Sequence, residues 1–185
     1  MAIIMKKRLS IIFISLIIIF IIYWNFRIDI KDYFISKDAI YWSEDVELKY
    51  SDFQADINLK SKSNIYYYYG FNLKANSIEK AYVRSYFDKD KSWIKDTLAP
   101  GMKLEMKIQK LIFDLNEVYV RKFNAEIDKI KFDKKTKFRD LENVGDRIYS
   151  ELEDVEDYMF QSTNTDSEVL LIWRPRVDSL LNLHK

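Results

Sequence analysis

The chain has 185 residues, of which 48% are hydrophobic and 16% aromatic, enough for one packed domain with an appendage. Its charges nearly cancel to a formal net charge of +1, so composition gives no electrostatic case for binding nucleic acid or an acidic substrate. The absence of cysteine excludes disulfides, thiolate metal sites and a cysteine nucleophile, and the scarcity of glycine and proline argues against extended disorder.

The N-terminal sequence predicts a single membrane span. A basic cluster from Lys6 to Arg8 precedes an apolar run over residues 9–26, which as a helix would be about 27 Å long, close to the thickness of a bilayer core. Because basic flanks stay in the cytoplasm, we interpret residues 1–8 as a cytoplasmic flank and 9–26 as a transmembrane signal anchor. A cleaved signal peptide is the alternative, although no small residues mark a cleavage site after the run.

The rest of the chain divides into a short connection and one domain. Residues 27–38 mix charged and aromatic side chains, and we expect them to be a linker that leads out of the membrane. Residues 39–185 are expected to form an α+β domain outside the cytoplasm, because β-like patterns come first and helical patterns follow. No internal repeat is present in the sequence.

Strand patterns fill the first part of this domain. Short β-like runs occur at 39–42 and 46–50. The aromatic-rich segment 63–75 predicts a longer strand, and the alternation of apolar and polar residues over 79–88 predicts another. We expect the two longer strands to pair as an antiparallel hairpin that turns around residues 75–77.

Helical patterns fill the second part. A Pro-Gly pair precedes a long predicted helix over about 102–131, and Thr136 is a candidate N-cap for another over about 137–160. The segment 168–183 predicts a last helix, which Pro175 should break or kink. The expected architecture is therefore a small antiparallel sheet packed on long C-terminal helices.

The long helix has a predicted buried face and an opposite face. At about 100° per residue, Ile108 and Ile112 fall in the middle of the apolar stripe. Asp114, Glu117 and Arg121 fall on the other side, and the last two have the i,i+4 spacing of an ion pair. Two interpretations are open: salt bridging at the surface or in a second layer, which we favour, or the carboxylates of an active site.

Three short motifs occur in order along the chain: a Trp-Ser followed by Asp-Phe, a strand end with Ser-Trp, and a helix with Phe-Asp, Glu and Arg. Their residues are Trp42, Asp52, Phe53, Ser92, Trp93, Phe113, Asp114, Glu117 and Arg121. In order and spacing they resemble the bacterial DUF922 family, a group of predicted secreted zinc-dependent peptidases. The resemblance covers residues 40–125, implies a zincin-like fold, and suggests that the matched residues are structural.

The chain departs from this family where the metal would bind. The family helix carries two zinc-binding histidines and a glutamate that activates water. Their positions hold Ile108, Ile112 and Gln109 here, and these side chains cannot bind zinc or accept a proton at neutral pH. The family's later histidine falls at residues 162–164, which contain none, and the sole histidine, His184, is next to last. The resemblance therefore implies a lost metal site, no cofactor and no catalytic residue.

The favoured hypothesis is a pseudopeptidase anchored in the bacterial cytoplasmic membrane. Its domain, periplasmic or extracellular, would bind a protein or envelope component without cleaving it. One alternative is a hydrolase that uses Asp114 and Glu117, or a divergent metal site. Another is a structural subunit of a membrane complex. The acidic run 151–157 and the aromatic run 66–69 are weaker candidates for a cation and a peptide or sugar, respectively; a solvated helix face and an ordinary strand are preferred there.

Overall fold

The computed structural model describes residues 2–75, 81–130, 138–162 and 165–183. For residues 2–7 it describes the backbone alone. Within the described residues a long N-terminal helix is followed by short strands in two antiparallel sheets and then by three helices. The predicted α+β class is therefore confirmed. The expected turn of the hairpin and the candidate cap Thr136 lie outside the described residues.

The main sheet has three antiparallel strands in the order β1 (Ala39–Tyr41), β4 (Ala81–Asp88) and β3 (Tyr69–Ala75). β3 and β4 pair along their whole length, so that the two ends of β3 face Phe87 and Ala81. The alternation seen in the sequence of β4 gives this strand two different faces. The predicted pairing of the two longer strands is confirmed.

The predicted strand over 63–75 is divided between two sheets. Its first part, β2 (Ile65–Tyr66), pairs with β5 (Trp93–Ile94), and its second part is β3. Between them, the backbone N–H of Tyr68 donates to Ser92 Oγ at 3.0 Å instead of to a neighbouring strand. The segment therefore changes partners where a side-chain hydroxyl replaces the backbone ladder.

The segment 46–50, expected as a strand, has no strand structure. It begins in a turn closed by the Val46 N–H and the Ser43 carbonyl, and it leads into the 3₁₀ helix η1 (Tyr50–Asp52). Val46 and Leu48 nevertheless pack on the hydrophobic core. Their alternation reflects burial against the core, which a loop can provide as well as a strand.

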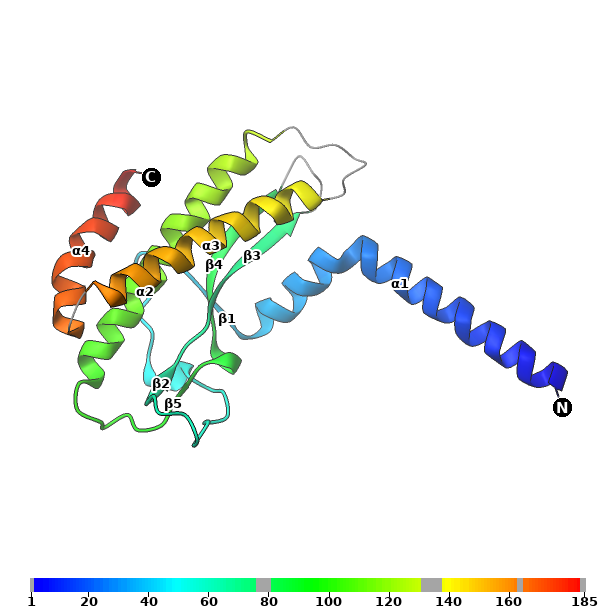
Figure 1. The fold of residues 1–185 in the computed structure, drawn as a ribbon, viewed down its shortest axis with the longest axis horizontal. Coiled ribbons are helices and arrows are strands. Elements are labelled where there is room, and N and C mark those ends of the chain that lie inside the picture. The colour runs from blue at the N-terminus through cyan, green and yellow to red at the C-terminus, as the bar shows by residue number, and fades with distance from the viewer. Residues whose placement is uncertain (1, 76–80, 131–137, 163–164, 184–185) are drawn as a thin grey trace.

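Helix α2 (Met102–Ile127) lies at the centre of the domain (Figure 1). The main sheet packs on one side of it, while α3 (Arg139–Gln161) and α4 (Asp166–Leu183) pack on others. Its buried residues, which extend from Met102 to Ile127, therefore surround much of its circumference. The three predicted helices are confirmed, although α2 ends earlier than expected.

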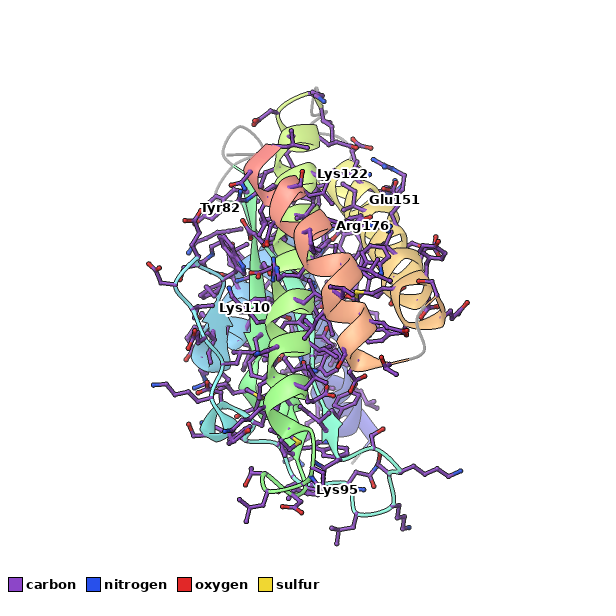
Figure 2. All side chains as sticks on the ribbon, turned by 90° about the vertical axis from the view of Figure 1, so that its left-hand side faces the viewer. Tyr82, Lys95, Lys110, Lys122, Glu151 and Arg176 are labelled. Atoms are coloured by element: carbon purple, nitrogen blue, oxygen red, sulfur yellow. The ribbon has the colours of Figure 1, made fainter. Side chains whose placement is uncertain are left out.

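The helical layer is joined by packing and by surface ion pairs. Lys122 of α2 and Glu151 of α3 form one such pair at the outer surface (Figure 2). α4 continues through Pro175 rather than breaking there, because proline removes only one hydrogen bond of the helical ladder. The main core cluster includes Tyr69 and Phe87 of the sheet, Ile108, Ile112 and Phe113 of α2, and Trp173 of α4.

Helix α1 (Ala2–Asp38) is continuous from the apolar run into the segment expected as a linker. From Arg8 onward it is long and apolar enough to cross a membrane or to be a signal sequence, with a mean hydropathy of 2.5 in its most apolar window. None of that window is buried in the protein. Figure 1 shows that the N-terminal part of α1 projects away from the domain and that the helix bends before β1.

Residues 27–38, expected as a linker out of the membrane, are the helical end of α1, and this end packs on the main sheet. Asp32 accepts a hydrogen bond from Asn72 Nδ2 at 2.8 Å and pairs with Lys74 Nζ at 3.2 Å. Ile28 is buried. Two of the charged residues that suggested a linker, Arg27 and Asp32, have partners far away in the sequence, which sequence patterning alone cannot reveal.

Candidate functional site

The carboxylate of Asp114 lies at the contact between α2, α4 and the segment after β1. Trp42 Nε1 donates to Asp114 Oδ1 at 2.7 Å, and Lys110 Nζ donates to the same oxygen at 2.8 Å. Arg174 Nη1 donates to Asp114 Oδ2 at 2.7 Å. Asp114 is only 4% exposed, so its charge requires these partners, two of which are cations. One buried carboxylate therefore connects three separate segments.

Two cations of α2 lie close to the ring of Trp42. Its centroid is 5.0 Å from the guanidinium carbon of Arg121 and 5.5 Å from Lys110 Nζ, both within cation–π range. Arg121 also donates from Nε to Glu117 Oε1 at 2.9 Å and from Nη1 to the Leu181 carbonyl at 2.8 Å. Burial raises the pKa of the Glu117 carboxyl, and the bonded Arg121 opposes that rise. This network fixes the positions of the cations around Asp114.

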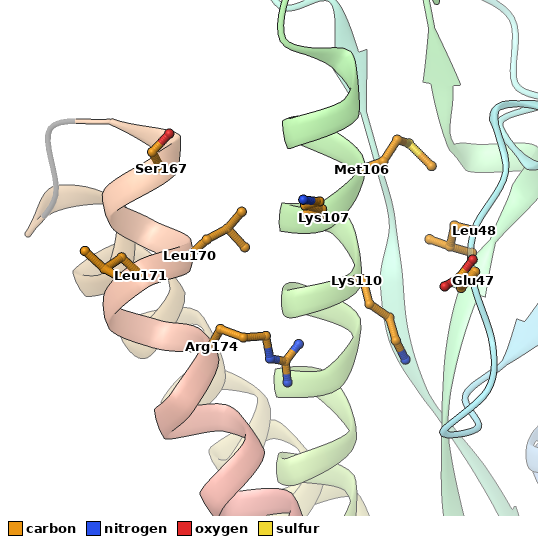
Figure 3. A pocket seen from close by; sticks show the side chains of 9 residues that line it. All are labelled: Glu47, Leu48, Met106, Lys107, Lys110, Ser167, Leu170, Leu171 and Arg174. Atoms are coloured by element: carbon orange, nitrogen blue, oxygen red, sulfur yellow. The ribbon is translucent and has the colours of Figure 1, made fainter.

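A groove of about 630 Å³ opens beside this network, between the 47–48 segment, α2 and α4 (Figure 3). We call it the α2–α4 groove. Its lining residues are Glu47, Leu48, Met106, Lys107, Lys110, Ser167, Leu170, Leu171 and Arg174. Leu171, one of the lining residues, is 77% exposed. The volume is within the range of small-ligand sites.

The groove combines an apolar floor with a basic lining. The lining includes three cations, Lys107, Lys110 and Arg174, and one anion, Glu47. Lys110 and Arg174 are also bound to Asp114 beneath them, whereas Lys107 is exposed and has no ion-pair partner among the described residues. The arrangement suits a ligand that carries both apolar groups and a negative charge, such as a protein segment with acidic side chains.

The three positions that the family resemblance assigns to metal chemistry lie inside the core. Ile108 and Ile112 are 2% and 0% exposed, as their position in the apolar stripe predicted. Gln109 is also buried: its Nε2 donates to Glu105 Oε1 at 2.9 Å, and its Oε1 accepts from the Tyr69 hydroxyl at 3.1 Å. Apolar packing and amide hydrogen bonds therefore satisfy these positions.

The opposite side of α2 carries a salt-bridged layer that is largely covered. Asp114 is buried, and Glu117 and Arg121 are partly buried, because α4 and the Trp42 segment cover them. The i,i+4 pair predicted between Glu117 and Arg121 is present. Of the salt bridging expected at the surface or in a second layer, the structure shows the partly buried form, because α4 covers the polar side of α2. The periodicity of one helix cannot show that a second helix covers it.

The other matched residues make separate contacts. Phe53 packs its ring edge-on against Phe87 with centroids 5.0 Å apart, and the Asp52 carboxylate accepts from the Lys49 N–H at 2.7 Å. The hydroxyl of Ser92 donates to the Asp88 carbonyl at 2.7 Å, Trp93 stacks on Tyr66, and Phe113 belongs to the core cluster. Of the matched residues, the structure gathers Trp42, Asp114, Glu117 and Arg121 in the Asp114 network. Sequence patterning missed Lys110 and Arg174, since their role depends on the helix–helix contact.

The aromatic and acidic runs meet in a smaller cavity of about 200 Å³, lined by Tyr66 to Tyr69, Tyr149, Glu153 and Glu156. Burial raises the pKa of Glu156 to about 7, and the nearby charges of Glu153 and Asp157 add to the rise. Burial likewise raises the pKa of Tyr149 to about 12. Glu156 is thus part of a tyrosine-lined hollow rather than of a fully solvated face.

Within the described residues, no group of three or more histidine, cysteine, aspartate or glutamate side chains is placed to hold a metal ion. Comparison with known proteins gives no match: no family model, no curated protein and no solved structure matches the chain. The family resemblance and the loss of a metal site therefore stay predictions, while the Asp114 network and the α2–α4 groove are features of the fold itself.

Proposed function

We propose that this chain is a membrane-anchored binding protein whose domain lies outside the cytoplasm and takes up a protein segment in the α2–α4 groove without cleaving it. The observation that carries the proposal is the groove itself, with its exposed Leu171 and its basic lining of Lys107, Lys110 and Arg174. The Asp114 network holds two of these cations in place before any ligand arrives. Such preorganisation lowers the entropic cost of binding.

The absence of catalysis is part of the proposal. Ile108, Gln109 and Ile112, where the resemblance would require metal ligands and a base, are buried side chains with apolar or amide partners. The alternative of a carboxylate-based hydrolase is less well supported, because both oxygens of Asp114 accept hydrogen bonds and Glu117 is bound to Arg121. Neither carboxylate is among the residues that line the groove.

The groove is tested with two synthetic peptides of the same apolar pattern, one with acidic and one with lysine side chains between the apolar positions. Titration of the detergent-solubilised full chain by fluorescence anisotropy should show tighter binding of the acidic peptide. Lys107→Glu should weaken it about five-fold, the effect of a partly exposed charge contact. The matched control is Lys60→Glu, which makes the same charge change on an exposed residue outside the groove. Equal binding of both peptides, or an equal effect of both variants, contradicts the proposal.

The orientation is tested separately with single cysteines, since the chain has none of its own. Leu98 is 91% exposed, and a cysteine there should react with a membrane-impermeant maleimide in intact cells. A cysteine in place of Lys7 should react only after the cells are permeabilised, because the basic flank stays in the cytoplasm. The reverse pattern would reject the orientation.

A further inference from the structure

A second groove lies where α1 meets the main sheet, and we call it the α1 groove. It has a volume of about 530 Å³ and is bounded by α1 from Tyr23 to Ile35, by Leu73 and by Tyr86. A further hollow of about 230 Å³ shares Leu73 and Tyr86 with it and continues along β3 to Gly145 of α3. The two together form a path from the end of the apolar helix into the domain.

The walls of the α1 groove are mainly apolar. Ile28, Ile30, Ile35 and Leu73 line it, and Phe34 stands at its side with 62% of its surface exposed. The apolar lining residues together, rather than any single exposed side chain, favour an interaction surface. The groove can therefore bury an apolar chain.

The charged side chains of the α1 groove favour the binding of an anion. Arg27 is held by Glu142 through two hydrogen bonds of 2.9 Å, and Lys91 pairs with Asp88 at 2.8 Å. Lys31 is exposed, lines both hollows, and has no ion-pair partner among the described residues. Because the other two cations are already compensated, Lys31 gives the groove its excess positive charge.

The groove is also continuous with the predicted membrane span. Tyr23, Arg27 and Lys31 follow one another at i,i+4 spacing, so they form one row along α1 that leads from the apolar segment into the groove. Tyr23 belongs to the apolar run 9–26, and tyrosine and basic residues are typical of the membrane interface. The groove would thus open at the level of the lipid head groups.

We propose that the α1 groove binds one anionic phospholipid of the surrounding bilayer, with an acyl chain against Ile28 and Leu73 and the phosphate near Lys31. This inference rests on the membrane anchoring in the proposed function but not on the α2–α4 groove. A peptide strand added to the outer edge of β3 is a less suitable occupant, because the Arg27–Glu142 pair joins α1 to α3 beside that edge.

The test uses the full chain in lipid nanodiscs that contain phosphatidylglycerol with a photoreactive acyl chain, and crosslinked residues are mapped by mass spectrometry. We expect labels within residues 27–38 and at Leu73 or Tyr86, in addition to labels in residues 9–26. Leu73→Trp, which fills the groove, should remove the groove labels and leave those in 9–26. Leu171→Trp places the same side chain in the other groove and should change nothing.

A charge variant completes the test. Phosphatidylglycerol should label the groove more strongly than phosphatidylcholine, and Lys31→Glu should reduce this preference about five-fold or more, because one lysine near an anionic lipid contributes on that order. Lys31 is exposed, so this variant keeps the test valid if Leu73→Trp does not fold.

Two results would overturn the lipid site while leaving the anchor intact: labels confined to 9–26, or equal groove labelling by the two lipids. A different result would assign the groove to strand addition instead. In that case an extended peptide would slow amide exchange along β3, and lipid would leave this exchange unchanged. A chain that does not enter the bilayer fails the anchoring proposal itself, and the cysteine labelling detects that failure separately.

Discussion

The indole N–H of Trp42 donates to Asp114 Oδ1 across 72 positions of sequence, at 2.7 Å. This contact fastens the segment after β1 to the middle of α2, and Arg174 of α4 binds the other oxygen of the same carboxylate. Both residues belong to the sequence motifs, yet their meeting depends on the packing of α2 against its neighbours. The contact is therefore the structural centre of the face that carries the α2–α4 groove.

Replacing Asp114 by alanine should destabilise the protein strongly. The substitution leaves Lys110, Arg174 and the Trp42 N–H without their acceptor, and removal of one partner of a buried ion pair costs about 3 to 5 kcal/mol. Because Arg174 is 30% exposed and can regain water, we expect about 2 to 4 kcal/mol in the free energy of unfolding. Urea unfolding of the solubilised chain measures it.

The matched control is Asp178→Ala. Asp178 also pairs with Arg174 but is 54% exposed, so its loss should change the free energy of unfolding by less than about 1 kcal/mol. Equal effects of the two substitutions would mean that the Asp114 network is no more than a surface contact.

Asp32 should hold the end of α1 against the sheet. Asp32→Ala removes the acceptor of Asn72 and the partner of Lys74, so residues 27–38 should exchange their amide hydrogens faster. Asp29→Ala changes an exposed carboxylate on the same helix and should leave the exchange as it is. Hydrogen exchange with mass spectrometry measures both variants, and unchanged protection in Asp32→Ala would show that Asp32 does not hold this segment on the sheet.

Stability should fall as the pH rises from about 5 to 8, because Glu156 loses a proton in a partly buried site. Its pKa is about 7 in the folded protein against 4.5 ordinarily, so the folded state binds more protons between these values and is favoured at the lower pH. Allowing for partial exposure, we expect Glu156→Gln to stabilise the protein by about 1 to 2 kcal/mol at pH 8 and to have little effect below pH 4.5.

The control for this titration is Asp154→Asn, an exposed carboxylate of the same helix. It should alter stability by less than about 0.5 kcal/mol at either pH. Urea unfolding at several pH values distinguishes the two variants. If the stability of Glu156→Gln depends on pH as that of the wild type does, Glu156 is not the group that causes the pH dependence.

Zinc offered to the purified chain should not remain after dialysis. The positions that correspond to zinc ligands in the resembled family are buried isoleucines, and isoleucine has no lone pair for a metal. Mass spectrometry measures how much zinc remains bound per chain. Near-stoichiometric zinc would show that the ligands lie elsewhere, and a search should then include His184, which is outside the described residues.

Much of the secondary structure follows from local patterns. The apolar stripe through Ile108 and Ile112 predicted both the long helix and its buried side, and the alternation over 79–88 predicted β4. These predictions succeed because helical and strand periodicities are properties of the chain itself. Where Val46 and Leu48 alternate without forming a strand, the same pattern arises from burial of a loop.

The sequence by itself determined the apolar N-terminal helix, the α+β class, the exclusion of cysteine chemistry, and isoleucine at the positions compared with metal ligands. Tertiary structure decided that α4 covers the polar side of α2, that Asp114 is buried among cations, and that residues 27–38 pack on the sheet. The physical reason is the sequence distance over which each feature forms. Periodicity within one helix or strand shows which of its sides avoids water, whereas a groove or a buried ion pair forms only where elements distant in sequence meet.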